Sequence, residues 1–148
     1  MNSIFISGTA GFGTKAITSL PQSVTQYLDT CIDQNYQILI GDCIGIDSLV
    51  QEYINKRGYD NIIVYCSGSN CRNIANPNWR IKHVNVPYGV RGRDFFAAKD
   101  KVMAQDADYA LAIWDGKSKG TEANIINMKA QNKTVIIYRT DKAYFESI

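Results

Sequence analysis

The sequence has no long apolar stretch. Its longest apolar runs cover about five residues, as in 110–114, whereas a helix that crosses a bilayer needs about 20. The N-terminus also lacks the basic region and the long apolar segment of a secretory signal. We therefore expect a cytoplasmic protein that does not contact a membrane.

The chain is poor in histidine, with a single residue at position 83, and its four cysteines lack the spacing of a metal site. Cys66 and Cys71 have four residues between them, and Cys31 and Cys43 lie far upstream. Metal-binding and redox cysteines often occur as closely spaced CxxC pairs. The pattern predicts four reduced thiols, no metal and no cofactor.

Neither sign of charge dominates the sequence. The net charge is +2 and charged residues make up 20% of the chain, so bulk electrostatics gives no reason to expect nucleic acid as a partner. Six basic residues nevertheless fall within thirty positions: Arg91, Arg93, Lys99, Lys101, Lys117 and Lys119. Such a run fits either a solvated helix face or the lining of an anion pocket.

Internal repeats and low-complexity segments are missing as well. What the chain does contain is a series of short apolar, β-branched segments: 3–7, 37–40, 61–66, 80–84, 109–114 and 134–138. Several are apolar throughout rather than alternating, which is typical of parallel strands covered on both faces. The pattern predicts a single α/β domain over 1–148, a Rossmann-like three-layer sandwich with a mostly parallel sheet of about five to six strands.

Segments of helical length separate these strands. Apolar residues at helical spacing predict helices near 21–32, 47–54 and 93–105, and a fourth from about residue 121. In the fourth we expect Ala123, Ile126 and Ala130 on the apolar face. A short fifth helix is predicted at 142–147.

Asn35, Gly58 and Asn132 stand just before strands. These residue types tolerate the left-handed conformation that ends a helix, so we expect helices to stop there. The Asn-rich segment 67–78 breaks the alternation and reads as a loop that either covers a site or joins two elements.

Three glycine-containing turns follow predicted strands, where open parallel sheets bind their ligands. The first holds Gly8, Thr9 and Gly11. Glycines let backbone N–H groups approach an anion closely. We expect these three residues to contact a phosphate, although a plain flexible loop explains the same pattern.

The second turn runs from Gly41 to Asp47 and leads directly into a helix. Gly41 allows a sharp turn, Gly45 permits close backbone approach, and Asp47 can cap the helix. Asp42 puts a carboxylate at a strand end, where burying a charge without a partner is costly. All four are predicted ligand-binding residues.

The third turn, 114–122, also opens a helix. Ser118, Gly120 and Thr121 are predicted to bind phosphate, and Asp115 to accept a hydrogen bond from a ribose hydroxyl. Glu122 fits the first helical turn for electrostatic reasons alone. Arg93, before the third helix, is predicted either to clamp a phosphate or to pair with Asp94.

The segment GDCIGID at 41–47 resembles the GGxxGID turn of the SLOG superfamily, which includes DNA-processing protein A and the LOG phosphoribohydrolases. Arg93-Asp94, Met103, Ala107-Asp108 and Gly120-Thr121 resemble, in order, the pattern of its small stand-alone YspA/YpsA-like branch. The resemblance covers nearly the whole chain. It implies a Rossmann-like domain that binds nucleotides or nucleotide-derived ligands and forms a homo-oligomer.

The resemblance leaves catalysis open. The LOG hydrolases carry a glutamate three residues after the threonine of their glycine turn, and this chain has Asn124 there. An amide is neither a carboxylate nucleophile nor a general base.

Two functions follow from these observations. The first is a module that senses or sequesters a nucleotide-like, phosphate-bearing molecule. The alternative is an N-glycosidic hydrolase or transferase acting on nucleoside monophosphates, with Asp42, Asp115 or Glu122 as catalytic residues. A third reading, a binder of single-stranded DNA, finds no support in the charge balance or in spaced aromatic residues.

Overall fold

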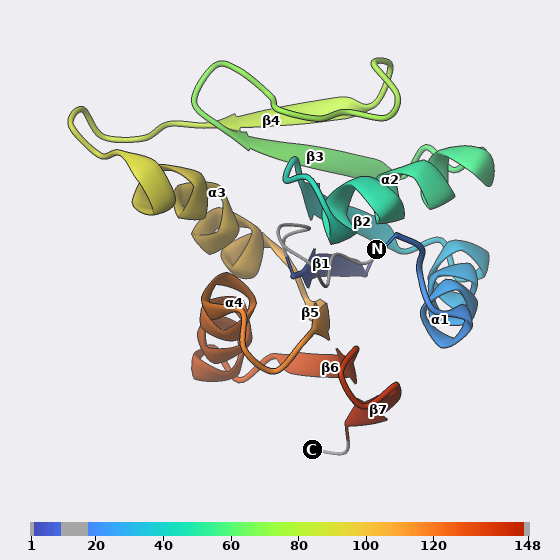
Figure 1. The fold of residues 1–148 in the computed structure, drawn as a ribbon. Coiled ribbons are helices and arrows are strands. Elements are labelled where there is room, and N and C mark those ends of the chain that lie inside the picture. Colours follow the sequence, from blue (N-terminus) through green and yellow to red (C-terminus); the bar gives the residue numbers. More distant parts are fainter. Residues whose placement is uncertain (1, 10–17, 147–148) are drawn as a thin grey trace.

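A computed structural model describes residues 2–9 and 18–146 of the chain. Seven strands form one sheet in the order β4-β3-β2-β1-β5-β6-β7 (Figure 1). The strands are β1 (Ser3–Gly8), β2 (Gln37–Gly41), β3 (Ile62–Ser67), β4 (Arg80–Val84), β5 (Tyr109–Trp114), β6 (Thr134–Arg139) and β7 (Tyr144–Glu146). All neighbouring pairs are parallel except β6 and β7.

Four helices cover the two faces of the sheet (Figure 1). They are α1 (Gln22–Asp33), α2 (Ile46–Lys56), α3 (Gly92–Asp106) and α4 (Lys119–Ala130). One apolar core joins α1 and α2 to the sheet, and a second joins α3 and α4 to the opposite face. The predicted Rossmann-like three-layer fold is therefore confirmed.

The near-continuous apolar strands follow from this double coverage. Phe5 belongs to the core under α3 and α4, while its neighbours Ile4 and Ile6 belong to the core under α1 and α2. Successive side chains of a strand point to opposite faces, so both alternating sets must be apolar. The β1 strand, which lies in the middle of the sheet, is buried on both faces for this reason.

The predicted helix at 142–147 is wrong. The chain there forms β7, a short antiparallel strand that pairs with β6. Phe145 contacts the Tyr138 ring edge-on with centroids 5.1 Å apart. Packing of this aromatic pair and the cross-strand bonds overrides a weak local helix preference, and β7 makes the strand count seven rather than five or six.

The helix α4 forms as expected but turns another face inward. Its buried residues are Thr121, Asn124, Ile125 and Met128, whereas the expected Ala123, Ile126 and Ala130 are exposed. The buried set still has the i, i+3, i+4, i+7 spacing of one helical face. The prediction failed because two members of that face are polar and lie at the site described below.

The expected helix ends are confirmed. Asn35 and Asn132 have φ angles of 57° and 59°, and Gly58 has a φ of 65°. No helix within the described residues is both long and apolar enough to cross a bilayer.

The prediction of four reduced thiols is wrong for two of them. Cys66, at the end of β3, forms a disulfide with Cys71 in the following loop. The chain folds back after β3 and brings the two Cα atoms to 5.2 Å, a separation that a disulfide requires. Cys31 and Cys43 are free thiols.

Candidate functional site

A hollow of about 410 Å³ lies at the carboxyl ends of β1 and β2, between the starts of α2, α3 and α4. We call it the inner hollow. Its wall includes glycines from both strand ends, the first turn of α4 and three charged residues of α3. This is where ligands bind in open parallel sheets.

Gly8 is required by the packing at the end of β1. A Cβ atom on Gly8 would lie 2.2 Å from the Ile46 side chain in the first turn of α2. Only glycine allows β1 and α2 to approach this closely. Gly8 therefore brings the start of α2 to the rim of the inner hollow.

Gly41 makes room for two charged side chains. A Cβ atom there would lie 2.8 Å from Lys99 Cε and 2.9 Å from Asp47 Oδ2. The missing side chain thus brings a lysine of α3 and a carboxyl of α2 together beside the end of β2. The positive charge of Lys99 favours the ionised form of Asp47 there.

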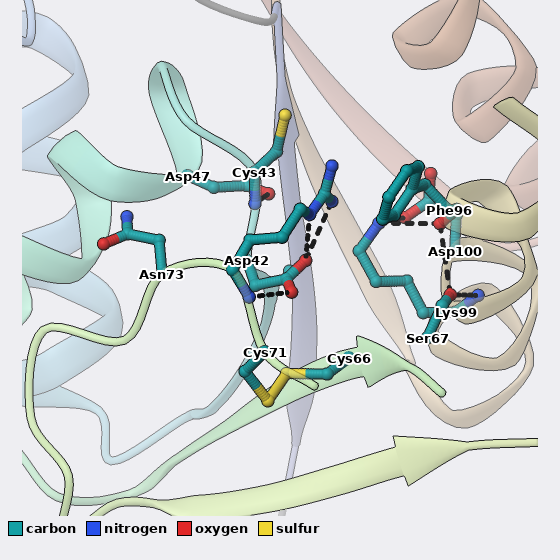
Figure 2. Close-up of polar contacts among 12 residues, drawn as sticks. Asp42, Cys43, Asp47, Cys66, Ser67, Cys71, Asn73, Phe96, Lys99 and Asp100 are labelled. Atoms are coloured by element: carbon teal, nitrogen blue, oxygen red, sulfur yellow. Dashed lines mark hydrogen bonds and ion pairs between the residues drawn. A yellow bond between two sulfur atoms is a disulfide. The ribbon is translucent and has the colours of Figure 1, made fainter. Parts of the chain in front are cut away.

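Lys99 is a buried cation in the wall of the inner hollow, only 4% exposed. Its Nζ donates to the Phe96 carbonyl at 2.8 Å and pairs with Asp100 Oδ1 at 3.3 Å (Figure 2). Its backbone N–H donates to Ser67 Oγ at 3.2 Å. These contacts hold the ammonium group at the hollow rather than in solvent.

Asp47 is the carboxyl residue for which Gly41 leaves room, beside Lys99. Burial raises the pKa of its carboxyl to about 7, although nearby Lys99 acts in the opposite direction. Asp47 Oδ2 accepts a hydrogen bond from the Cys43 backbone N–H at 3.2 Å. A carboxyl with this pKa holds its proton for a large part of the time near neutral pH.

Asp100 brings a second carboxyl to the same wall. Burial raises its pKa, while Lys99 and the Asn124 amide lower it. Asn124 Nδ2 lies 3.5 Å from Asp100 Oδ2. The position at which LOG hydrolases carry a glutamate thus holds an amide, and α3 supplies a carboxylate beside it.

Both carboxylate oxygens of the buried Asp42 accept hydrogen bonds from Arg72. It accepts the Arg72 backbone N–H at 2.8 Å and pairs with the Arg72 guanidinium at 2.8 Å (Figure 2). That guanidinium also stacks 3.9 Å from the centre of the Phe96 ring. The loop 68–79 thereby contributes a cation to the inner hollow.

Two further contacts hold this loop in place. The disulfide joins Cys71 to the end of β3 (Figure 2), and Gln51 of α2 donates to the Gly41 and Asn73 carbonyls and accepts the Ala75 N–H. Asp42, Cys66 and Cys71 place three potential metal ligands within 4.8 Å. These groups already have partners: Asp42 pairs with Arg72, and Cys66 and Cys71 form the disulfide.

The turn between β5 and α4 is ordered by its own side chains. Asp115 Oδ1 accepts the backbone N–H groups of Lys117 and Ser118 at 2.9 and 2.7 Å. The Asp115 N–H donates to Thr9 Oγ1 at 3.2 Å, which ties the ends of β5 and β1 together. Asp115 and Thr9 thus shape the turn that presents the first residues of α4.

The structure brings together many of the ligand-binding residues predicted from sequence. Those in the wall of the inner hollow are Gly8, Gly41, Asp47, Arg93, Ser118, Gly120 and Thr121. The wall does not include Thr9, Asp42, Gly45 or Asp115, and Gly11 lies outside the described residues. The three catalytic candidates Asp42, Asp115 and Glu122 are not in the wall.

The ligand-binding residues predicted from sequence did not include several residues of this wall: Arg72, Phe96, Lys99, Asp100 and Asn124. Of these, Lys99 was named only as a member of the basic run. Nothing in the α3 sequence marks Lys99 as buried, because a lysine within a helix ordinarily faces solvent. Arg72 had a weak signal, namely its place in a loop expected either to cover a site or to connect elements. Of the six residues of the basic run, Arg93, Lys99 and Lys119 line the hollow. The other three, Arg91, Lys101 and Lys117, do not.

The sequence matches no family model and no curated protein. Among solved structures, the fold is similar to that of a DNA processing protein A from Helicobacter pylori, described for its binding of single-stranded DNA. The TM-score is 0.58 at 14% identity, and the match covers 92% of this chain and 65% of the other. The chain thus has a fold of the DNA processing protein A type and spans less than two thirds of that relative.

This likeness corrects one expectation. We did not expect nucleic acid as a partner, because the charge is balanced. A protein of the same fold binds single-stranded DNA, so the fold is compatible with such a ligand. Net charge alone is no evidence against such a ligand, because it does not describe the local charges of one hollow.

Proposed function

We propose that the chain binds a nucleotide or a nucleotide-derived, phosphate-bearing ligand in the inner hollow, as a sensor or sequestering module. The observation that carries the proposal is the buried ammonium group of Lys99, which shares the wall with the first turn of α4. A buried lysine needs an anion to offset its desolvation. A phosphate supplies more negative charge than Asp100 alone.

The start of α4 supplies the second half of a phosphate site. Ser118, Lys119, Gly120 and Thr121 all line the inner hollow. The first N–H groups of a helix have no partners within the helix and lie at its positive end. A Cβ on Gly120 would meet nothing within 4 Å, so a phosphate can approach this backbone closely.

We also propose that the chain belongs to the small YspA/YpsA-like branch of the SLOG superfamily. The order of its motifs supports this assignment, as does a fold of the DNA processing protein A type. On the same basis we propose a single domain over 1–148 that acts as a cytoplasmic homo-oligomer.

One observation favours an N-glycosidic hydrolase or transferase as a second candidate. Asp47 and Asp100 are two carboxyls with raised pKa values in the wall of one hollow. A carboxyl that is protonated near neutral pH can act as a general acid, and an ionised one can stabilise an oxocarbenium-like transition state. Asp42, Asp115 and Glu122 do not line this hollow, so Asp47 and Asp100 replace them as the catalytic candidates of this second function.

Calorimetric titration with dAMP, deoxyadenosine and inorganic phosphate tests the binding proposal. We expect dAMP to bind at least ten times more tightly than deoxyadenosine, because the phosphate contacts Lys99 and the start of α4. Lys99→Met should remove this difference, whereas the matched control Lys129→Met changes an exposed lysine at the far end of α4. Equal affinity for dAMP and deoxyadenosine in the wild type would contradict the proposal.

Chromatography of the same mixtures separates binding from hydrolysis. Release of free adenine from dAMP that is lost in Asp47→Asn supports the hydrolase. Intact dAMP after prolonged incubation supports the sensor. Titration with a single-stranded oligonucleotide completes the panel, and binding of the oligonucleotide without binding of dAMP would contradict a nucleotide pocket.

A further inference from the structure

A second hollow adjoins the inner one. It has a volume of about 780 Å³ and lies between the 84–90 connection, α3 and α4. We call it the outer hollow. The two hollows share six wall residues: Arg93, Ala97, Asp100, Lys119, Gly120 and Asn124. The two hollows are therefore adjacent, and these six residues border both of them.

Three of the shared residues are charged, namely the carboxyl residue Asp100 and the cations Arg93 and Lys119, which we call the junction cations. Arg93 and Lys119 are exposed, and neither forms an ion pair with any residue in the described part of the chain. By contrast, Arg57, Arg72 and Arg139 all have carboxylate partners. Two unpaired cations across a gap, with the open backbone of Gly120 between the hollows, fit a phosphate group.

The outer hollow differs from the inner one in chemistry. Its walls include Val86 and Val90 of the connection, Val102 of α3 and Ala123 of α4. The side-chain amides of Asn85 and Asn127 lie at the same hollow. Apolar walls with a few amides suit a flat, polar-edged group such as a nucleobase.

We infer that the ligand consists of two nucleosides joined through phosphate, one in each hollow, with the phosphate at the start of α4. There it lies between the junction cations Arg93 and Lys119 and the part of the inner wall that Lys99 forms. This inference rests on the proposed function and goes further by naming the size and class of the ligand. The same chemistry occurs in a free dinucleotide and in two consecutive units of a single strand. Both would occupy the two hollows in the same way.

A second copy of the chain is the other candidate for the outer hollow. The observations favour the ligand because the outer hollow shares six wall residues with the inner one, the junction cations among them. Its wall also includes Asp94 and Lys101 in addition to the junction cations, and charged residues are depleted in the cores of stable interfaces.

Filling the outer hollow without disturbing the fold tests the inference. Ala123 lines this hollow and is exposed, so Ala123→Trp adds bulk there without entering the core. Ala130→Trp is the matched control, because Ala130 is exposed on the same helix and lies in neither wall. The probes are dAMP, the dinucleotide d(ApA) and a ten-residue single strand of dA, each titrated by calorimetry.

We expect d(ApA) to bind at least ten times more tightly than dAMP. Ala123→Trp should abolish this gain and leave the dAMP affinity within twofold of wild type, and Ala130→Trp should change neither. A further gain for the dA strand, also lost in Ala123→Trp, identifies single-stranded DNA as the source of the two nucleosides. No further gain identifies a free dinucleotide.

Three outcomes would overturn the inference. If dAMP binds and d(ApA) binds no better, the proposed function stands and the two-nucleoside ligand fails. If Ala123→Trp weakens dAMP and d(ApA) equally, the outer hollow has no role of its own. If Ala123→Trp lowers the mass in sedimentation, the outer hollow is an interface between copies. Failure of dAMP to bind the wild type would instead overturn the proposed function.

Discussion

The two walls of the inner hollow use their polar groups differently. On the α2 side, Asp42 is paired with Arg72, Gln51 holds the following loop, and a disulfide closes that loop. On the α4 side, Lys119 and Gly120 face the hollow without such partners among the described residues. The proposed function therefore assigns the α2 wall to the scaffold and the α4 wall to ligand binding.

The largest expected effect tests the scaffold wall. Asp42→Ala should lower the free energy of unfolding by about 3 kcal/mol, because it leaves the Arg72 backbone and guanidinium without their buried acceptor. Chemical denaturation measures this change. The control Asp141→Ala removes an exposed partner of Arg139 and should cost less than about 1 kcal/mol. Equal losses of stability in the two variants would contradict the distinction between the buried pair Asp42–Arg72 and the surface pair Asp141–Arg139.

A pH series tests whether the carboxyl of the α2 wall is buried as described. Because the pKa of Asp47 is about 7 in the folded protein and 3.8 in the ordinary case, its contribution to stability is fully present below about pH 4 and is lost as the pH rises through 7. Asp47→Asn should remove this slope, a difference on the order of 3 kcal/mol between pH 4 and 8. If the free energies of unfolding of the wild type and Asp47→Asn changed with pH in parallel, the raised pKa of Asp47 would be contradicted.

Reduction tests the tether of the scaffold loop. Opening the disulfide should lower the free energy of unfolding by about 2 kcal/mol, since the unfolded chain regains the freedom of a short closed loop. Thermal melts with and without dithiothreitol measure the effect, and Cys71→Ser should not respond to the reductant. Cys43→Ser is the control and should respond like wild type. A wild-type melting temperature that does not change with dithiothreitol would show that the disulfide does not form in solution.

The smallest expected effects compare one glycine from each wall. Gly41→Ala should cost about 1–2 kcal/mol and weaken dAMP binding, because the new methyl group displaces Lys99 and Asp47. Gly120→Ala has open space around it and should be neutral or stabilise α4 by up to about 1 kcal/mol. Thermal melts of both variants measure these changes in stability. Greater damage from Gly120→Ala would reverse the roles of the two walls.

Much of this fold is readable from local patterns. Apolar strands such as β5 and left-handed residues such as Asn35 and Asn132 are determined by nearby sequence, and the structure confirms them. The α4 face and β7 were not predictable in this way. The buried face of α4 is set by its contacts with β5, β6 and α3, and β7 forms because β6 offers it a free edge.

The same limit applies to the site. Glycine turns mark its location because their backbone requirements are local, as at Gly41. The charged residues that complete it arrive from distant segments, with Lys99 from the middle of α3 and Arg72 from a loop. Nor did the spacing of Cys66 and Cys71 reveal that the chain folds back on itself.

The arrangement of the cysteines has a practical consequence. Cys31 is buried and two others share a disulfide, so Cys43 is the free thiol that remains partly accessible among the described residues. It lines the inner hollow. Burial and Asp47 raise the pKa of its thiol, so a fluorescent maleimide will react slowly but at one position. The chain thus has a built-in attachment point for an optical reporter of ligand occupancy.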